Sequence, residues 1–184
     1  MIGMGGECNM KRWVISDTHF YHKNIIGYCQ RPFANIEEMH KELIKRWNNT
    51  AAKDDIVYHL GDFAFGSKEQ VAEIVGQLNG RIRLIMGNHD HKKYKDYVGC
   101  GFDRVYDGPI ILDNWAIMSH HPHFVNMQMP YINIYGHVHD DYNHTDVAPT
   151  GACVCVERWE YKPVDLDQLL AKIQKLREGY KQYE

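Results

Sequence analysis

Five strand-like apolar runs in this sequence are each followed by a side chain that can bind a metal ion. The runs are WVIS, IVYHL, RLIM, AIMS and INIY. The polar residues that follow them are, in chain order, Asp17 with His19, Asp62, Asn88, His120, and His137 with His139. In open α/β sheets the carboxyl ends of parallel strands share one edge, where ligands bind. The pattern therefore predicts that groups far apart in the sequence converge on one site.

The apolar runs alternate with amphipathic helical segments, which is typical of an α/β domain. We expect strands at 13–16, 56–60, 82–86, 109–112, 115–119 and 131–135, and within 151–158. No internal repeat or long linker interrupts the alternation. The fold class predicted from the pattern alone is therefore α/β.

Capping signals predict where three helices begin. The pairs are Asn35 with Glu38, Ser67 with Gln70, and Asp165 with Gln168. Apolar residues at helical spacing after each start predict the face that each helix buries. In chain order these faces are Met39, Leu43, Ile44 and Trp47; Val71, Ile74, Val75 and Leu78; and Leu166, Leu169, Leu170, Ile173 and Leu176.

Length and composition limit the class of protein. The chain has 184 residues, of which 44% are hydrophobic, so we expect one domain over 10–184, with 1–9 as a flexible N-terminal extension. Basic residues number 21 and acidic residues 24, which gives a net charge of −3 and no strong signal for nucleic-acid binding. No apolar run approaches the roughly 18 residues of a membrane span, and no signal peptide is recognised. We therefore expect a cytoplasmic protein with no membrane partner.

Cysteine usage argues against a disulfide framework or a thiolate zinc site. The five cysteines are an odd number without CxxC spacing, so free thiols are expected.

Histidine placement strengthens the prediction of a metal site. Nine of the twelve histidines fall within 19–22, 89–91, 120–123 and 137–139. Imidazole and carboxylate ligands suit zinc, iron, manganese or nickel, and the lack of cysteine beside these blocks favours an open catalytic site. A carboxylate such as Asp62 can bridge two ions about 3.5 to 4 Å apart.

The short stretch GHVH fits such a centre. Side chains two residues apart on an extended chain point to the same side, so His137 and His139 can each offer an imidazole. Gly136 allows the backbone to leave the strand and pass close to the ions.

Five blocks carry a resemblance to a known family. They are DTH at 17–19, GD at 61–62, GNHD at 87–90, SHHP at 119–122 and GHVH at 136–139. In this order they resemble the signature of the calcineurin-like metallophosphoesterases. The flanking text SDTHFYHKNI, RPF, VYHLGDFAFG and YKPV is similar to a compact bacterial and phage subgroup of that family. The resemblance implies a four-layer α/β/β/α sandwich of two mixed β-sheets flanked by helices.

The resemblance also implies a dinuclear centre. One divalent metal would be held by Asp17, His19, Asp62 and His139, and the other by Asp62, Asn88, His120 and His137. It further implies His89 and Asp90 as catalytic residues: His89 stands over the phosphate and protonates the leaving oxygen, and Asp90 orients His89. A bridging hydroxide would attack in line with the leaving group.

Several polar residues have a simpler alternative. Asp and Asn end strands readily, so Asp17, Asp62 and Asn88 could be turn residues, although their occurrence together in these blocks favours ligands. His120 is favoured over His121 as a ligand by alignment with the family, and His121 is then a candidate substrate contact.

Other residues near the blocks are candidates for substrate contact or for structural positions. His22 and Arg31 are further candidate substrate contacts, although a loop arginine is more often solvated, and His123 also lies close in sequence. His59 is expected in the core or behind the site. His40, His91 and His144 are expected at the surface.

The function expected is hydrolysis of a small phosphate ester, with a phosphodiester or nucleotide-like substrate slightly preferred over a monoester. Tyr21 and Tyr135 depart from residues frequent in the subgroup, so substrate preference does not transfer. GNHD lacks the flanking Arg and Glu typical of protein Ser/Thr phosphatases, which makes phosphoprotein a less expected substrate. The alternatives are a nuclease or RNA-end phosphatase, and a non-catalytic metal-binding interaction scaffold of the same fold.

Overall fold

The structure is a computed structural model that describes residues 10–90 and 94–181. Within these residues the strands form two five-stranded mixed sheets. The first has the order β10 (Val164–Asp165), β1 (Arg12–Ile15), β2 (Ile56–His59), β3 (Arg81–Ile85) and β4 (Arg104–Tyr106). The second has the order β5 (Ile110–Leu112), β6 (Ala116–Ser119), β7 (Ile132–Tyr135), β9 (Gly151–Cys153) and β8 (Val147–Ala148).

Most neighbouring strands are parallel, and this aligns their carboxyl ends. Strands β1 to β4 run parallel, with β10 antiparallel at the edge. Strands β6, β7 and β9 run parallel in the second sheet, with β5 and β8 antiparallel at its edges. Each sheet therefore presents one edge of carboxyl ends, as the sequence pattern predicts.

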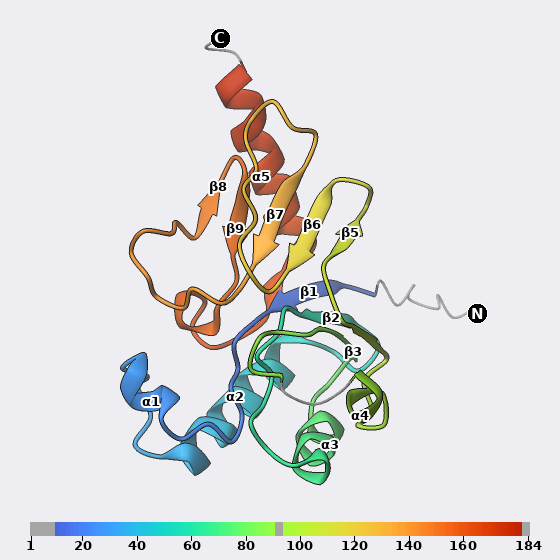
Figure 1. The fold of residues 1–184 in the computed structure, drawn as a ribbon, viewed down its shortest axis with the longest axis vertical. Coiled ribbons are helices and arrows are strands. Elements are labelled where there is room, and N and C mark those ends of the chain that lie inside the picture. Colours follow the sequence, from blue (N-terminus) through green and yellow to red (C-terminus); the bar gives the residue numbers. More distant parts are fainter. Residues whose placement is uncertain (1–9, 91–93, 182–184) are drawn as a thin grey trace, which may run out of the picture.

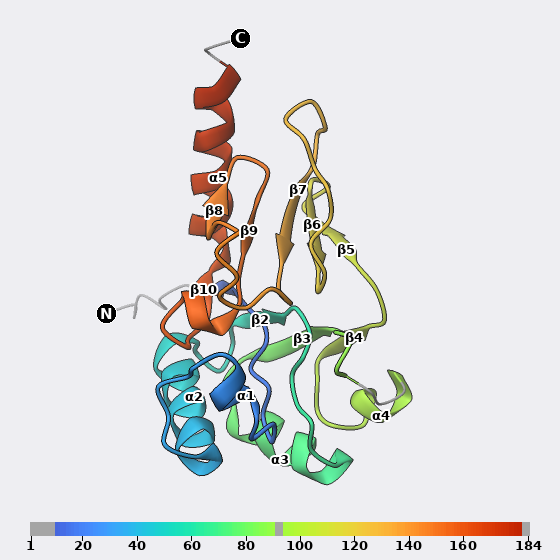
Figure 2. The ribbon, with the colours of Figure 1, turned by 60° about the vertical axis from the view of Figure 1, so that its left-hand side comes forward.

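Helices flank the two sheets, so the expected sandwich fold is confirmed. Helices α1 (Ile25–Tyr28), α2 (Ile36–Thr50) and α3 (Lys68–Gln77) lie below the first sheet in Figure 1, and α5 (Leu166–Lys181) runs beside the second. Figure 2 shows the second sheet standing above the first, with α4 (Tyr94–Val98) below the β3–β4 side. A 3₁₀ turn, η1 (Val156–Arg158), follows β9.

All three predicted helix starts are confirmed by their caps. The Asn35 side chain accepts a hydrogen bond from the backbone of Glu38, and Ser67 with Gln70 forms a reciprocal capping box. Asp165 Oδ1 accepts from Gln168 N at 3.0 Å. These bonds satisfy backbone donors that a helix leaves free at its start.

Two hydrophobic cores share the first sheet. One lies between this sheet and helices α2 and α3 and includes Leu43, Trp47 and Ile74. The other joins the opposite face of the first sheet to the second sheet and to α5, with Met118 and Ile134 among its members. The second core thus fixes how the two carboxyl-end edges face each other.

The apolar stripes are mostly confirmed, with two corrections. Ile44 is only partly buried against the first core. Leu176 is 37% exposed, because α5 continues past the sheet that covers its earlier turns (Figure 1).

Short elements were missed by the sequence analysis. Strands β4, β8 and β10 have three residues or fewer, and helices α1 and α4 have five or fewer, too short for a periodic pattern. Cys29, Cys100, Cys153 and Cys155 are free thiols as expected, and Cys8 lies outside the described residues. Among the described residues no helix has the length and apolarity required to cross a bilayer.

The end of the α5 core face can be tested by a pair of substitutions. Ile173→Ala should lower the free energy of unfolding by about 2 to 5 kcal/mol, because Ile173 is fully buried. Leu176→Ala should change it by less than about 1 kcal/mol. Urea denaturation followed by circular dichroism measures both, and equal losses would contradict the burial difference.

Candidate metal centre

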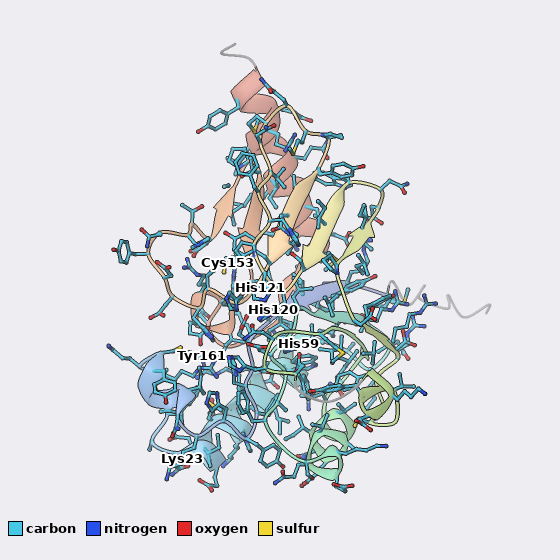
Figure 3. The ribbon with its side chains drawn as sticks, in the orientation of Figure 1. Lys23, His59, His120, His121, Cys153 and Tyr161 are labelled. Carbon is cyan, nitrogen blue, oxygen red and sulfur yellow. The ribbon has the colours of Figure 1, made fainter. Side chains whose placement is uncertain are left out.

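The predicted ligands meet where the two sheets join. Ser16, which follows β1, forms a parallel bridge with Cys155, which follows β9, and Ser16 N donates to Val154 O at 3.0 Å. Asp17 N donates to Gly61 O at 3.0 Å, which ties the end of β1 to the end of β2. In Figure 3, His120 and His121 lie at this junction.

A first group of ligand atoms surrounds Asp17. Atoms of Asp17, His19 and His139 all lie within 4.8 Å of one another. His19 Nε2 is 3.8 Å from Asp17 Oδ1, and His139 Nε2 is 3.9 Å from the same oxygen. These separations are too long for hydrogen bonds. Two atoms that each bind one ion at about 2.1 Å can lie up to about 4 Å apart, so the separations fit shared coordination.

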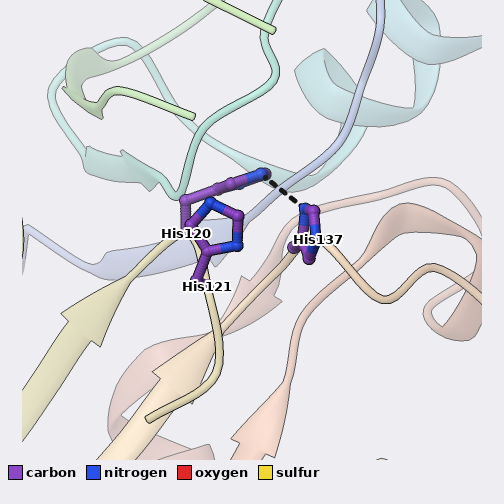
Figure 4. A group of neighbouring side chains, drawn as sticks. All are labelled: His120, His121 and His137. Atoms are coloured by element: carbon purple, nitrogen blue, oxygen red, sulfur yellow. Dashed lines mark hydrogen bonds between the residues drawn. The ribbon is translucent and has the colours of Figure 1, made fainter. Parts of the chain in front are cut away.

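A second group surrounds His120. Its Nε2 lies 2.8 Å from Asn88 Oδ1 and 3.2 Å from His137 Nδ1, a contact drawn in Figure 4. Asp62 Oδ2 is 3.4 Å from His120 Nε2 and 3.6 Å from His19 Nε2. A single carboxylate oxygen therefore lies between the two groups, which is the position that a bridging ligand requires.

Buried polar atoms test whether a cation fits this cluster. In the described part of the chain, Asp17 Oδ1 and His19 Nε2 are buried and have no hydrogen-bond partner. Burial raises the pKa of Asp17 and lowers the pKa of His19 to about 2. A buried carboxylate and a neutral imidazole that share no proton are costly unless a cation occupies the space between them. The residues present thus fit divalent metal ions.

Of the eleven residues other than glycine with positive φ in the described part of the chain, five are predicted ligands. Positive φ angles occur at Asp17 (59°), His19 (53°), Asp62 (55°), His137 (72°) and His139 (48°). Residues with a Cβ rarely adopt this region, and such strain persists where the surrounding structure requires it. Five of the seven predicted ligands are held in this way.

The glycine of GHVH is required by close approach. A Cβ at Gly136 would lie 2.5 Å from Asp17 Oδ2 and 2.6 Å from Ser16 Oγ. The absence of a side chain lets His137 N donate to Asp17 Oδ2 at 2.9 Å. The positive φ is at His137 and not at Gly136, so the glycine provides space and the histidine provides the change of direction.

Glu157 is a site residue that sequence reasoning missed. Its Oε1 lies 3.0 Å from His139 Nδ1, so the carboxylate orients this ring with Nε2 toward Asp17. The signal was present in the sequence, since Glu157 follows an apolar run in the same way as the predicted ligands do.

Arg31 is buried, which corrects the expectation of a solvated loop arginine. Its guanidinium donates to Glu157 Oε1, with Nη2 at 2.6 Å, and to the carbonyl oxygens of Asp17 at 2.7 Å and Thr18 at 2.9 Å. The side chain is fully buried. Its donors are used inside the protein, so Arg31 braces the ligand loop and is not in a position to clamp substrate phosphate.

Asp90 holds two ligand loops together. Its carboxylate accepts hydrogen bonds from the backbone N–H groups of Asp62, Phe63 and Gly87, and from the Tyr97 hydroxyl. These hydrogen bonds hold the 87–90 turn, which carries His89, against the Asp62 loop.

His89 is half-buried beside the cluster. The backbone N–H of His89 donates to Asp62 Oδ1 at 2.8 Å. The half-buried ring of His89 is 5.7 Å from the ring of His19. His22 lies beside it, with Nδ1 3.4 Å from His19 Nδ1. His121 is exposed, and its ring is 4.1 Å from the ring of His137. The structure thus brings His22 and His121 to the rim of the centre.

The remaining histidines divide between core and surface. His59 is fully buried, with Nε2 3.0 Å from Thr18 Oγ1, as expected. His40 is not a free surface residue, because its Nε2 accepts from Tyr21 N at 2.8 Å. His144 is half-buried against Tyr135, His123 is exposed, and His91 lies outside the described residues.

Two cysteines approach the cluster in space, which corrects the expectation drawn from their distance in sequence. Cys155 Sγ is 3.2 Å from Asp17 Oδ2. Cys29 can place its sulfur within 4.8 Å of His139 and Glu157 ligand atoms. Both sulfur atoms thus lie next to predicted ligands or their supports.

Comparisons with known proteins agree with this geometry. A family model described as calcineurin-like phosphoesterase matches residues 10–174. An uncharacterized protein of Methanocaldococcus jannaschii is 38% identical over 175 residues, 90% of this chain and 92% of that protein. The gene 66 protein of Mycobacterium phage L5 is 31% identical over 140 residues, 73% of this chain and 59% of the phage protein.

A solved structure supports the fold. A protein of unknown function from Aquifex aeolicus aligns with a TM-score of 0.65 and 27% identity, over 90% of this chain and all of the other.

The role of Glu157 can be tested by Glu157→Gln. Loss of the carboxylate should weaken Mn²⁺ binding by about 10- to 100-fold, because the His139 ring loses its charged partner. Isothermal titration calorimetry measures the affinity, with Glu160→Gln, an exposed neighbour, as the matched control. Unchanged affinity in a folded Glu157→Gln protein would contradict the role.

Metal binding should also release a proton from His139. Burial alone would lower its pKa, but hydrogen bonds with Cys29 and Glu157 and the charge of Asp17 outweigh burial and raise the pKa to about 11. The metal-free protein is then protonated at His139 near neutral pH, so Mn²⁺ affinity should rise as pH increases from 6 to 8. Titration in buffers of different ionisation enthalpy measures the release, and a pH-independent affinity would contradict it.

Proposed function

The chain belongs to the calcineurin-like phosphoesterase family, and we propose that it hydrolyses a small phosphate ester at a dinuclear metal centre. The observation that carries the proposal is the position of Asp62 Oδ2 between two groups of ligand atoms. Asp17, His19 and His139 complete one group, and Asn88, His120 and His137 complete the other. Two divalent ions bound there would supply Lewis-acid activation of water and of the phosphate.

The protein residues divide the remaining work. His89 lies beside the ligand groups, where its ring can give a proton to the leaving oxygen of the ester. Asp90 keeps the 87–90 turn against the Asp62 loop, so the position of His89 is fixed relative to the ligands. Arg31 and Glu157 hold the first ligand group from behind. Because these supports are buried, the ligand positions are set before substrate binds.

A phosphodiester or nucleotide-like substrate is preferred over a monoester in this proposal. The net charge of −3 gives no general attraction for nucleic acid, which disfavours the nuclease alternative. The scaffold alternative is disfavoured by the complete set of ligands together with His89, since a scaffold does not require a proton donor beside the ligand groups.

Two substitutions separate metal binding from proton transfer. Asp62→Ala should abolish both metal binding and hydrolysis of bis(4-nitrophenyl) phosphate, because each ligand group loses the shared oxygen. His89→Ala should retain the metals and lower kcat by about 10²- to 10⁴-fold for a dinucleotide, whose alkoxide leaving group needs a proton. The loss should be much smaller for bis(4-nitrophenyl) phosphate, because 4-nitrophenolate leaves without a proton. Elemental analysis measures the metals, and a chromogenic assay and product chromatography in Mn²⁺ measure the two hydrolysis rates. A metal-loaded wild-type protein that cleaves no mono- or diester in a broad screen would favour the scaffold.

A further inference from the structure

Aromatic side chains lie beside the first ligand group. The ring of Phe65 is 5.1 Å from the ring of His89 and 5.8 Å from that of His19. His22 stacks on Phe65, with ring centroids 4.0 Å apart and an interplanar angle of 19°. An ester oxygen that receives its proton from His89 would therefore carry its organic group against Phe65 and His22. This is the side of the leaving group.

A separate pocket lies on the other side, next to the second ligand group. It has a volume of about 190 Å³, and its walls include Pro122, His123, Phe124, Tyr135, His144 and Thr150. The loop after β6 forms one wall, while β7 and the segment before β9 form another. His123 N donates to Asn133 Oδ1 at 2.6 Å, which holds this loop over the sheet.

The pocket adjoins the candidate metal centre through two segments. Pro122 and His123 directly follow His120 and His121 in the chain. Tyr135 precedes His137 by two residues, so their Cα atoms lie at most about 7 Å apart. The rings of His121 and His137 are 4.1 Å apart, and Figure 4 shows His121 beside His120 and His137. A phosphate on the ligand groups could therefore reach the pocket with one substituent.

The chemistry of the pocket suits a ring. Phe124 lines the pocket and is 83% exposed, so its ring is accessible to a ligand that enters from solvent. The Tyr135 hydroxyl lies 3.2 Å from His144 Nδ1, so polar groups stand beside the aromatic surface. Pockets for whole drug-sized ligands measure about 300 to 1,000 Å³, so this one has room for a single ring system and not for a whole substrate.

We propose that this pocket binds the organic group that stays on phosphorus, a planar ring such as a nucleobase, and that the substrate is therefore a phosphodiester. The inference rests on the proposed function. In the reaction the P–O bond to the leaving group breaks and the oxygen of one water joins phosphorus. The leaving oxygen takes a proton from His89, and the proton that the water loses restores His89. The products are an alcohol, released on the Phe65 side, and a monoester held in the pocket. A monoester substrate has a single organic group, which leaves, and would not fill the pocket.

Two substrates with the same leaving group test the pocket. Thymidine 5′-(4-nitrophenyl phosphate) and methyl 4-nitrophenyl phosphate both release 4-nitrophenolate but retain different groups. For the Mn²⁺-loaded wild-type protein, kcat/KM should be at least about tenfold higher for the thymidine ester, since stacking of a base on an aromatic ring contributes on this scale. Phe124→Ala should reduce the ratio of the two kcat/KM values about tenfold. Tyr142 is 92% exposed and does not line the pocket, so Tyr142→Ala should leave the ratio of the two kcat/KM values unchanged.

A binding measurement gives a second readout that does not depend on turnover. By calorimetry, thymidine 5′-monophosphate should bind the Mn²⁺-loaded protein more tightly than inorganic phosphate, and Phe124→Ala should remove most of the difference. Equal affinities, or a kcat/KM ratio near one in wild type, would overturn the proposed pocket. If neither ester is cleaved, the proposed function fails, and the nucleotide affinities still decide whether the pocket accepts a base.

Discussion

The carboxylate of Asp17 is the group on which the arrangement of the site depends. It is completely buried where the first sheet meets the second. Its Oδ2 accepts from His137 N and approaches Cys155, so this one oxygen joins the ends of β1, β7 and β9. Its Oδ1 has no partner in the described protein and faces His19 and His139. The same side chain thus connects the sheets and leaves a buried negative charge for a cation to neutralise.

Buried charge behind the ligands explains how the geometry is maintained. The Arg31 guanidinium neutralises Glu157 and also takes the carbonyl oxygens of Asp17 and Thr18, which fixes a loop that contains strained φ angles. Glu157 in turn sets the orientation of His139. A buried ion pair contributes little to stability by itself, but here it determines where a ligand points. The strained φ angles and the buried ion pair add little or nothing to stability, but both hold metal ligands in place.

Much of the fold was predictable because its signals are local. The caps at Asn35, Ser67 and Asp165 involve residues three positions apart, and each was confirmed. Strands of four or five residues were found within about one residue at either end, whereas the two-residue strands β8 and β10 were not, because their pairing comes from the neighbouring strand. Arg31 was misjudged for the same reason, since its partner Glu157 is 126 residues away.

The sequence by itself determined which groups could serve a metal centre, because each follows an apolar strand run and matches a family block. It also determined the helix starts, through capping side chains. Only the tertiary structure decided that Asp62 Oδ2 lies between the two groups, that Asp90 braces loops and that His123 and Tyr135 line one pocket. These features depend on how two sheets pack across a shared core. Such packing brings together residues that are far apart in the chain, and no local sequence pattern indicates these contacts.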